Sequence, residues 1–232
     1  MYRRLIKPLI DICTAFIGSI ILLPLFILLV IAIKLDSRGP VLFKQKRVGK
    51  NKKLFNIYKF RTMRTDTPHD MPTHLLEDPD RYITRVGRFL RKTSLDELPQ
   101  IFNILSGQMS IVGPRPALWN QDDLIAERDK YGANALKPGL TGWAQVNGRD
   151  ELEITQKAAL DGEYAKRIGL WFDIRIFFMT VGKVFKSEGV VEGGTGAEKR
   201  SEQEQPDGSD TEDRRSARGT TVISDNANTE NQ

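Results

Sequence analysis

The chain has 232 residues, of which 40% are hydrophobic and 28% are charged, and its formal net charge is +5. This length allows one domain of ordinary size with short additions. Cys13 is the single cysteine, which excludes an intrachain disulfide and suits a reducing cytoplasm. The two histidines have no cysteine partners, so a zinc site is not expected, and carboxylate ligands would favour Mg²⁺ or Mn²⁺.

An apolar segment covers residues 9–35, with Asp11 as its only charge before Lys34. Its ~27 residues are enough to cross a ~30 Å hydrocarbon core as a helix. Pro24 lies in the middle and removes a helical hydrogen bond, and both flanks are rich in Lys and Arg. The residues alone leave two structures open: a plain transmembrane helix that tolerates a proline, and a re-entrant helix that bends at Pro24 and returns to the cytoplasmic side.

Short elements are predicted to follow this segment. Strands are expected at residues 41–43, 54–58 and 144–146, the first two being joined by a basic hairpin-like loop at 47–53. Residues 111–116 are predicted to form a rigid loop. Helices are predicted at 82–90, from about 96 to 107, and at 120–131, 153–168 and 170–185. The last of these is amphipathic, and its pattern fits either the headgroup layer or a core helix. The fold class is therefore α+β and mostly helical, with a short β-hairpin.

The charge is unevenly distributed along the chain. From Glu192 onward there are about ten acidic and five basic residues, so the rest of the chain carries about +10. The C-terminal segment has too little apolar content to form a core and is predicted to be disordered. The basic body suits anionic lipids or nucleotide phosphates. Nucleic acid is not expected, because no stacking platform or recognised nucleic-acid motif is visible.

Asp96 and Glu97 are adjacent at a predicted helix start, where backbone N–H groups and the helix dipole favour negative charge. Arg91 precedes them, and Arg115 lies on a loop stiffened by a proline on each side. A carboxylate can attack phosphorus as a nucleophile, but it approaches a diphosphate only when cations offset the repulsion. Mg²⁺ held by Asp96 and Glu97 would neutralise further charge. This combination indicates chemistry on a phosphorylated substrate.

Each of these signals also has a purely structural explanation. Ser94 and Glu97 match a capping box, which would account for the glutamate without any chemistry. Arg115 fits a surface ion pair, Lys59 and Arg61 fit the solvated face of a strand, and Arg149 fits a turn. Taken singly, none of these residues decides between catalysis and structure.

In order, however, the motifs resemble the bacterial sugar transferase family, the small monotopic phosphoglycosyl transferases. The resemblance starts with the basic and apolar N-terminal segment and runs to about Gly189. It rests on five further motifs: GPVLFKQKR at 39–47, FNIYKFRTM at 55–63, LRKTSLDELPQ at 90–100, GQMSIVGPRP at 107–116 and KPGLTGWAQVNGR at 137–149.

The resemblance implies transfer of a sugar 1-phosphate from a UDP-sugar to polyprenyl (undecaprenyl) phosphate with release of UMP, as the first step of surface polysaccharide or glycan synthesis. Asp96 would form a covalent phosphosugar intermediate, and Glu97 would assist by binding Mg²⁺ or by deprotonating the lipid phosphate. The residues expected to bind phosphate or nucleotide are Lys59, Arg61, Arg91, Arg115 and Arg149.

The resemblance also implies an architecture and a location. Residues 1–36 would be a re-entrant membrane helix broken at Pro24, residues 37–191 a cytoplasmic catalytic domain with membrane-interface helices, and residues 192–232 a disordered tail. The protein would lie at the cytoplasmic face of the bacterial inner membrane.

Several alternatives stay open at this stage. Residues 113–118 and 188–190 look most like members that use an N-acetylated 6-deoxyhexosamine such as N-acetylfucosamine, but galactose or glucose phosphate also fits. A non-catalytic, membrane-attached scaffold of a polysaccharide assembly complex is the alternative function. Association into a homodimer is likewise open.

Overall fold

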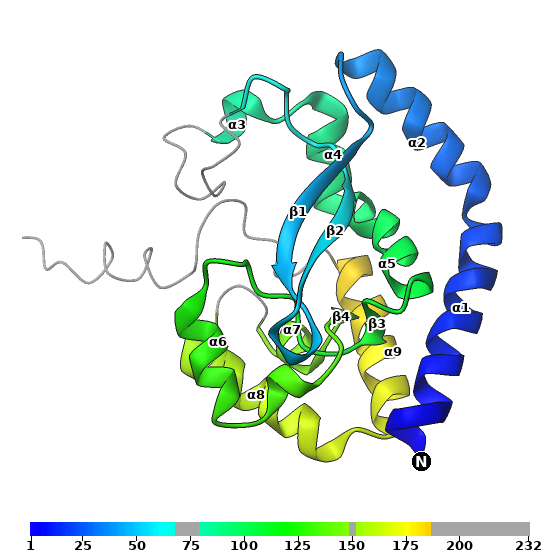
Figure 1. Ribbon diagram of the computed structural model, residues 1–232. Coiled ribbons are helices and arrows are strands. Elements are labelled where there is room, and N and C mark those ends of the chain that lie inside the picture. The colour runs from blue at the N-terminus through cyan, green and yellow to red at the C-terminus, as the bar shows by residue number, and fades with distance from the viewer. Residues whose placement is uncertain (68–78, 149–151, 187–232) are drawn as a thin grey trace, which may run out of the picture.

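The computed structural model describes residues 1–67, 79–148 and 152–186 (Figure 1). The predicted tail and Arg149 lie outside these ranges. The elements, in chain order, are η1 Tyr2–Ile6, α1 Lys7–Ile21, α2 Leu23–Asp36, β1 Leu42–Val48, η2 Lys50–Lys52, β2 Leu54–Phe60, α3 Pro79–Tyr82, α4 Arg85–Thr93, η4 Leu95–Gln100, α5 Ile101–Leu105, β3 Ser110–Val112, α6 Asp122–Asp129, η5 Ala133–Ala135, β4 Gly139–Thr141, α7 Trp143–Val146, α8 Ile154–Arg167 and α9 Leu170–Lys186. The prediction of a mixed, mostly helical fold is confirmed.

The N-terminal helix is broken, and its two halves form an arc along one side of the molecule (Figure 1). The segments Tyr2–Ile21 and Leu23–Asp36 meet at an angle of 62°. Leu22 separates them, and Pro24 cannot donate a backbone hydrogen bond across the break. By length and composition, no single helix in the described ranges would cross a membrane, and this bent pair is the only candidate for a broken span or a re-entrant loop.

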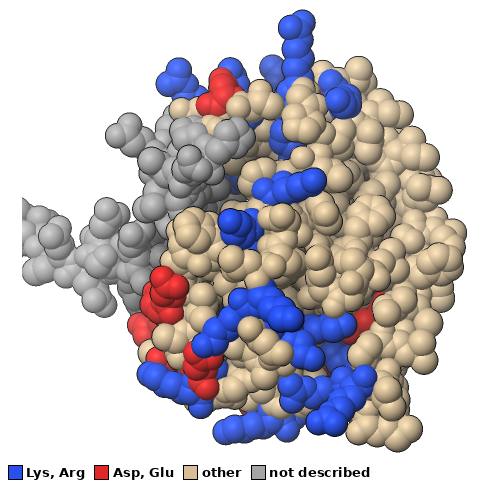
Figure 2. Space-filling model, in the orientation of Figure 1, with Lys and Arg blue, Asp and Glu red and all other residues tan. Residues whose placement is uncertain are grey.

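The two halves of this helix pack on the domain through their inner faces only. Ala15 of α1 is buried with Ile57 of β2 and Ile101 of α5. Leu29 of α2 is buried against Phe60. The outer face of α1 and α2 is apolar and exposed, and Figure 2 shows that side of the molecule almost without charge. Exposed members of this face include Leu9, Phe16, Ile20, Ile21, Leu28 and Leu35.

Two small sheets complete the frame. β1 and β2 form an antiparallel hairpin whose register runs from Leu42↔Phe60 to Val48↔Leu54, so both strands extend further than predicted. β3 and β4 pair in parallel. The predicted strand at 144–146 is wrong, because those residues lie in α7 and the strand comes before them. Glycine permits the close approach of the β3 and β4 segments, because a Cβ on Gly139 would lie 2.1 Å from the backbone nitrogen of Gly113.

The last helix joins the core to the N-terminus. Ile176 of α9 is fully buried with Tyr164, while Trp171 is 80% exposed. The core interpretation of its amphipathic pattern is therefore confirmed for the buried face, and placement of the exposed face in a headgroup layer stays a prediction. The buried Asp173 carboxylate accepts hydrogen bonds from Tyr2 Oη at 2.6 Å, Lys7 Nζ at 2.8 Å and Tyr164 Oη at 2.7 Å. This cluster fixes the start of α1 to α8 and α9.

Candidate active site

Asp96 and Glu97 lie in η4, a 3₁₀ helix that follows α4 directly. Ser94, between the two helices, adopts a left-handed conformation with φ 56° and ends α4. Within the described part of the chain, the Ser94 side chain makes no capping hydrogen bond. The predicted capping box is therefore wrong, and the predicted helix from 96 to 107 is divided into η4 and α5. The Glu97 side chain is consequently available for contacts with distant residues.

Glu97 sits between two cations that are far away in sequence. Its Oε1 lies 2.8 Å from Lys59 Nζ on β2 and 2.9 Å from Arg115 Nη2, and its Oε2 lies 3.5 Å from Arg115 Nη1. Burial alone would raise the pKa of Glu97, but Arg115 and Lys59 together outweigh burial and hold it well below its usual range. Glu97 is thus an ionised side chain that fixes the positions of both cations.

Asp96 is equally buried, with 9% of its surface exposed, but it is held more loosely. Its Oδ2 lies 3.8 Å from Lys59 Nζ, and no hydrogen bond to its carboxylate is found among the residues that the structure describes. Burial raises the pKa of Asp96, Lys59 opposes the shift, and the like charge of Glu97 adds to it. Because it is weakly solvated and accepts no hydrogen bond from the described residues, this carboxylate could act as a nucleophile when it is ionised.

The remaining predicted phosphate ligands fall into different places. Arg91 approaches the acid pair from α4, and its Nε donates to Thr62 Oγ1 at 3.0 Å. Arg61 points elsewhere: its guanidinium donates to the Ser37 and Arg38 carbonyl oxygens and secures the chain after α2. Arg149 lies outside the described residues. The structure therefore brings together Lys59, Arg91, Arg115 and the acid pair, and does not place Arg61 with them.

Sequence reasoning missed Asn103, which positions the β-hairpin. Asn103 is completely buried on α5; its Oδ1 accepts from the Tyr58 amide at 3.1 Å, and its Nδ2 donates to the Asn56 carbonyl at 2.8 Å. These bonds hold β2 at the residues next to Lys59. The available signal was the position of Asn103 within the apolar run IFNIL at 101–105. A side-chain amide that is buried among apolar residues needs hydrogen-bonding partners from elsewhere in the fold.

The acid pair is also the candidate metal site. Across the ranges 1–67, 79–148 and 152–186, no group of three or more His, Cys, Asp or Glu side chains could enclose a metal ion. Two adjacent carboxylates nevertheless fit Mg²⁺, which commonly binds one or two carboxylates together with substrate phosphates. Asp96 is the better placed of the two, because both Glu97 oxygens already contact cations.

The geometry combines a buried, loosely held carboxylate with several cations, an arrangement that could accommodate a phosphorylated substrate. Residues 2–187 match the family described as bacterial sugar transferase. The chain belongs to the bacterial sugar transferase family. The match covers every described element, from η1 to α9. The resemblance inferred from the ordered motifs is therefore confirmed.

Three relatives illustrate the family. The undecaprenyl-phosphate glucose phosphotransferase of Komagataeibacter xylinus is 43% identical over 185 residues, covering 75% of this chain and 35% of that protein. The undecaprenyl-phosphate galactose phosphotransferase of Salmonella typhimurium is 39% identical over 200 residues, covering 80% and 42%. An uncharacterized sugar transferase of Bacillus subtilis, EpsL, is 42% identical over 190 residues, covering 80% and 90%. The chain thus spans less than half of the first two relatives and most of the third.

Proposed function

We propose that this protein transfers a sugar 1-phosphate from a UDP-sugar to polyprenyl phosphate. The single observation that carries the proposal is the buried, loosely held Asp96 carboxylate beside Lys59, Arg91 and Arg115. The names of the glucose and galactose phosphotransferases among its relatives support the same chemistry.

In the first step, an Asp96 oxygen attacks the β-phosphorus of the UDP-sugar. A carboxylate–phosphorus bond forms, the bond from that phosphorus to the bridging oxygen breaks, and the electron pair leaves with UMP. Arg115 and Lys59, which contact the acid pair, would offset the charge that accumulates on the diphosphate. Mg²⁺ held by Asp96 and Glu97 would supply additional charge neutralisation.

In the second step, an oxygen of polyprenyl phosphate attacks the same phosphorus, and the Asp96 carboxylate is released. The product is a polyprenyl diphosphate sugar, so the two steps balance without an oxidant or a reductant. Of the two roles expected for Glu97, binding of Mg²⁺ is favoured over deprotonation of the lipid phosphate. A carboxylate whose pKa lies well below its usual range is a weak base.

A membrane location follows from the substrate and the surface. Polyprenyl phosphate is confined to a bilayer, and the exposed apolar face of α1 and α2 would be immersed in lipid. A bend of 62° lets both ends of the broken helix lie on one side. Because both flanks are basic, we place that side in the cytoplasm, at the inner membrane.

A UMP-release assay tests the proposed activity. The full chain in detergent, supplied with Mg²⁺, polyprenyl phosphate and a panel of UDP-sugars, should release UMP with at least one donor. The panel should include N-acetylated 6-deoxyhexosamines, glucose and galactose. The sequence motifs suggest the first class, although residues 188–190 lie outside the described ranges, and relatives are named for the other two. If none of the UDP-sugars leads to UMP release, the scaffold function is favoured instead.

The pH dependence of the first step should reveal the surroundings of Asp96. Since burial raises the Asp96 pKa, the rate of intermediate formation should rise with pH through a value above that of an ordinary aspartate. Lys59→Met removes a cation that lowers this pKa, so the acidic limb of the pH–rate profile should move to higher pH. Glu97→Gln removes a like charge and should move it to lower pH.

Single-turnover rates across pH measure these shifts, with Lys53→Met, at an exposed lysine, as the control. Only the midpoint of the acidic limb is compared, because both active-site variants should also be slower. Shifts in the same direction for the two variants would contradict Asp96 as the titrating group.

A further inference from the structure

A second basic site lies at the opposite end of the hairpin from the acid pair. It is a cavity of about 690 Å³ between the start of the N-terminal helix, the tip of the β1–β2 hairpin, β3 and the loop before β4. That volume falls within the range of small-molecule sites. Lys59 lies five residues along β2 from Leu54, or about 17 Å at ~3.3 Å per residue. The cavity shares no lining residue with the acid pair or its cations.

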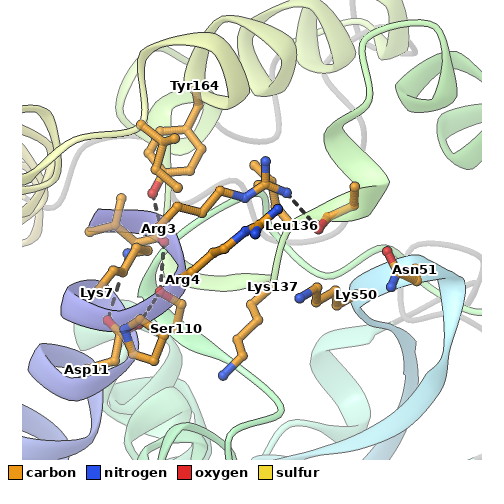
Figure 3. A pocket seen from close by; sticks show the side chains of 14 residues that line it. Arg3, Arg4, Lys7, Asp11, Lys50, Asn51, Ser110, Leu136, Lys137 and Tyr164 are labelled. Atoms are coloured by element: carbon orange, nitrogen blue, oxygen red, sulfur yellow. Dashed lines mark hydrogen bonds and ion pairs between the residues drawn. The ribbon is translucent and has the colours of Figure 1, made fainter. Parts of the chain in front are cut away.

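Five cations and one carboxylate line this cavity. The cations come from three separate parts of the chain, and Figure 3 shows the Arg3 and Arg4 side chains reaching from the helix towards the segments that carry Lys50 and Lys137. Figure 2 shows Lys and Arg side chains gathered on the same part of the surface. The one carboxylate, Asp11, already accepts hydrogen bonds from Ser110 Oγ at 2.6 Å and from the Ile111 amide at 3.1 Å. Both oxygens of this carboxylate are therefore already engaged by donors other than the arginines.

Most of these cations lack an anionic partner. Lys7 is paired with Asp173 at 2.8 Å and lies 3.8 Å from Asp11. Arg3 donates to the Ala135 carbonyl at 3.1 Å, which holds its guanidinium at the rim. Arg4, Lys50 and Lys137 make no ion pair with any residue in the described ranges. Cations gathered in this way repel one another, and a bound anion would relieve that repulsion.

The hairpin tip is held in a conformation that keeps Lys50 at the cavity. Asn51 and Lys52 both have positive φ, 55° and 62°, which is unfavourable for residues other than glycine. An ion pair between Lys52 Nζ and Asp129 Oδ2, at 2.5 Å, connects the tip to α6. The hairpin tip that carries Lys50 thus has a contact with α6 outside the cavity, which would help to preorganise an anion site.

We propose that this cavity is a second phosphate-binding site, separate from the site of chemistry. The guanidinium groups of Arg3 and Arg4 and the ammonium groups of Lys50 and Lys137 match the oxygens of a phosphate group. The phosphate belongs either to an anionic lipid headgroup or to a soluble phosphate compound. Exposed Leu5 and Leu9 on the same helical turns would place a lipid's chains beside the cavity. The site would fix the N-terminal end of the broken helix when it is occupied.

Binding to the full chain in detergent tests this proposal by isothermal titration. The lipid probe is dihexanoyl phosphatidylglycerol, compared with the zwitterionic dihexanoyl phosphatidylcholine, and the soluble probe is inorganic pyrophosphate. The double variant Lys50→Gln/Lys137→Gln should weaken binding of at least one anionic probe about tenfold or more, because two charge-assisted contacts are lost. The probe that is affected identifies the source of the phosphate.

Two controls separate this site from general charge and from the acid pair. Lys53→Gln/Lys166→Gln removes the same charge at exposed positions and should leave binding unchanged. Arg115→Gln alters the surroundings of the acid pair. It should not reduce the part of the probe binding that is lost in the Lys50→Gln/Lys137→Gln variant. The proposal is overturned if the wild type binds neither anionic probe, if the Lys50/Lys137 variant binds as the wild type does, or if the exposed double variant loses as much affinity.

Discussion

Replacing Asp96 by asparagine should lower UMP release by about a thousandfold or more, because the substitution removes the nucleophile itself. Asparagine has nearly the same shape and cannot form the phosphosugar bond. The fold should survive, since burial disfavours the ionised Asp96 and a neutral side chain avoids that cost. The loss should therefore appear in the rate of the first step and not in the unfolding temperature.

The measurement combines UMP release with mass spectrometry of protein quenched during turnover with a labelled donor. The wild type should carry a sugar phosphate on the peptide that contains Asp96. Asp122→Asn, at an exposed acid of α6, is the matched control and should keep full activity. Substantial turnover by Asp96→Asn, or product formation by the wild type without an adduct on that peptide, would refute the covalent mechanism.

Asp173→Ala should destabilise the folded protein by about 3–5 kcal/mol, the usual cost of removing one partner from a buried ion pair. The substitution leaves Lys7 buried with only the longer 3.8 Å contact to Asp11. It also removes the acceptor for the Tyr2 hydroxyl and leaves the Tyr164 hydroxyl with only the Val112 carbonyl. For a chain of this size, the loss corresponds to roughly 6–20 °C in Tm.

Thermal unfolding in detergent, followed by circular dichroism, measures this effect. Asp66→Ala is the comparison, because Asp66 also forms an ion pair, with Arg64 at 2.6 Å, but both side chains are more than half exposed. That variant should lose no more than about 1 kcal/mol. Equal Tm values for the two variants would show that the buried cluster does not anchor α1.

The long amphipathic helices could be predicted closely from sequence, whereas the short elements were predicted with less accurate bounds, or with the wrong type at 144–146. Predicted ranges 153–168 and 170–185 agree closely with α8 and α9, because several turns of regular pattern define each helix. β1 was predicted too short, since Lys44 and Lys46 interrupt the apolar signal. Their side chains lie over the Tyr58 and Trp119 rings, which lets a basic strand extend along the hairpin.

The sequence predicted most of the residues of the candidate site, but it did not predict the contacts that these residues make. The pattern Ser-x-x-Glu fits a capping box locally, yet Glu97 is engaged by Lys59 and Arg115, which lie 38 and 18 residues away. Such distant pairing leaves no trace in local spacing. Lys59 and Arg61 looked equivalent, because alternate residues of a strand share a face. The Arg61 guanidinium, however, donates to the Ser37 and Arg38 carbonyl oxygens after α2, whereas Lys59 contacts the acid pair.

The contact between Asp11 and β3 has a consequence for biogenesis. An aspartate within an apolar helix opposes entry into lipid by about 2.5–3.5 kcal/mol when it is placed at the bilayer centre. Its hydrogen-bonding partners are Ser110 and the Ile111 amide, which lie 99 and 100 residues later in the chain. The ribosome must therefore synthesise nearly half of the polypeptide before α1 can form these hydrogen bonds with β3. In the membrane location proposed above, stable insertion of α1 would therefore depend on folding of the domain that carries β3.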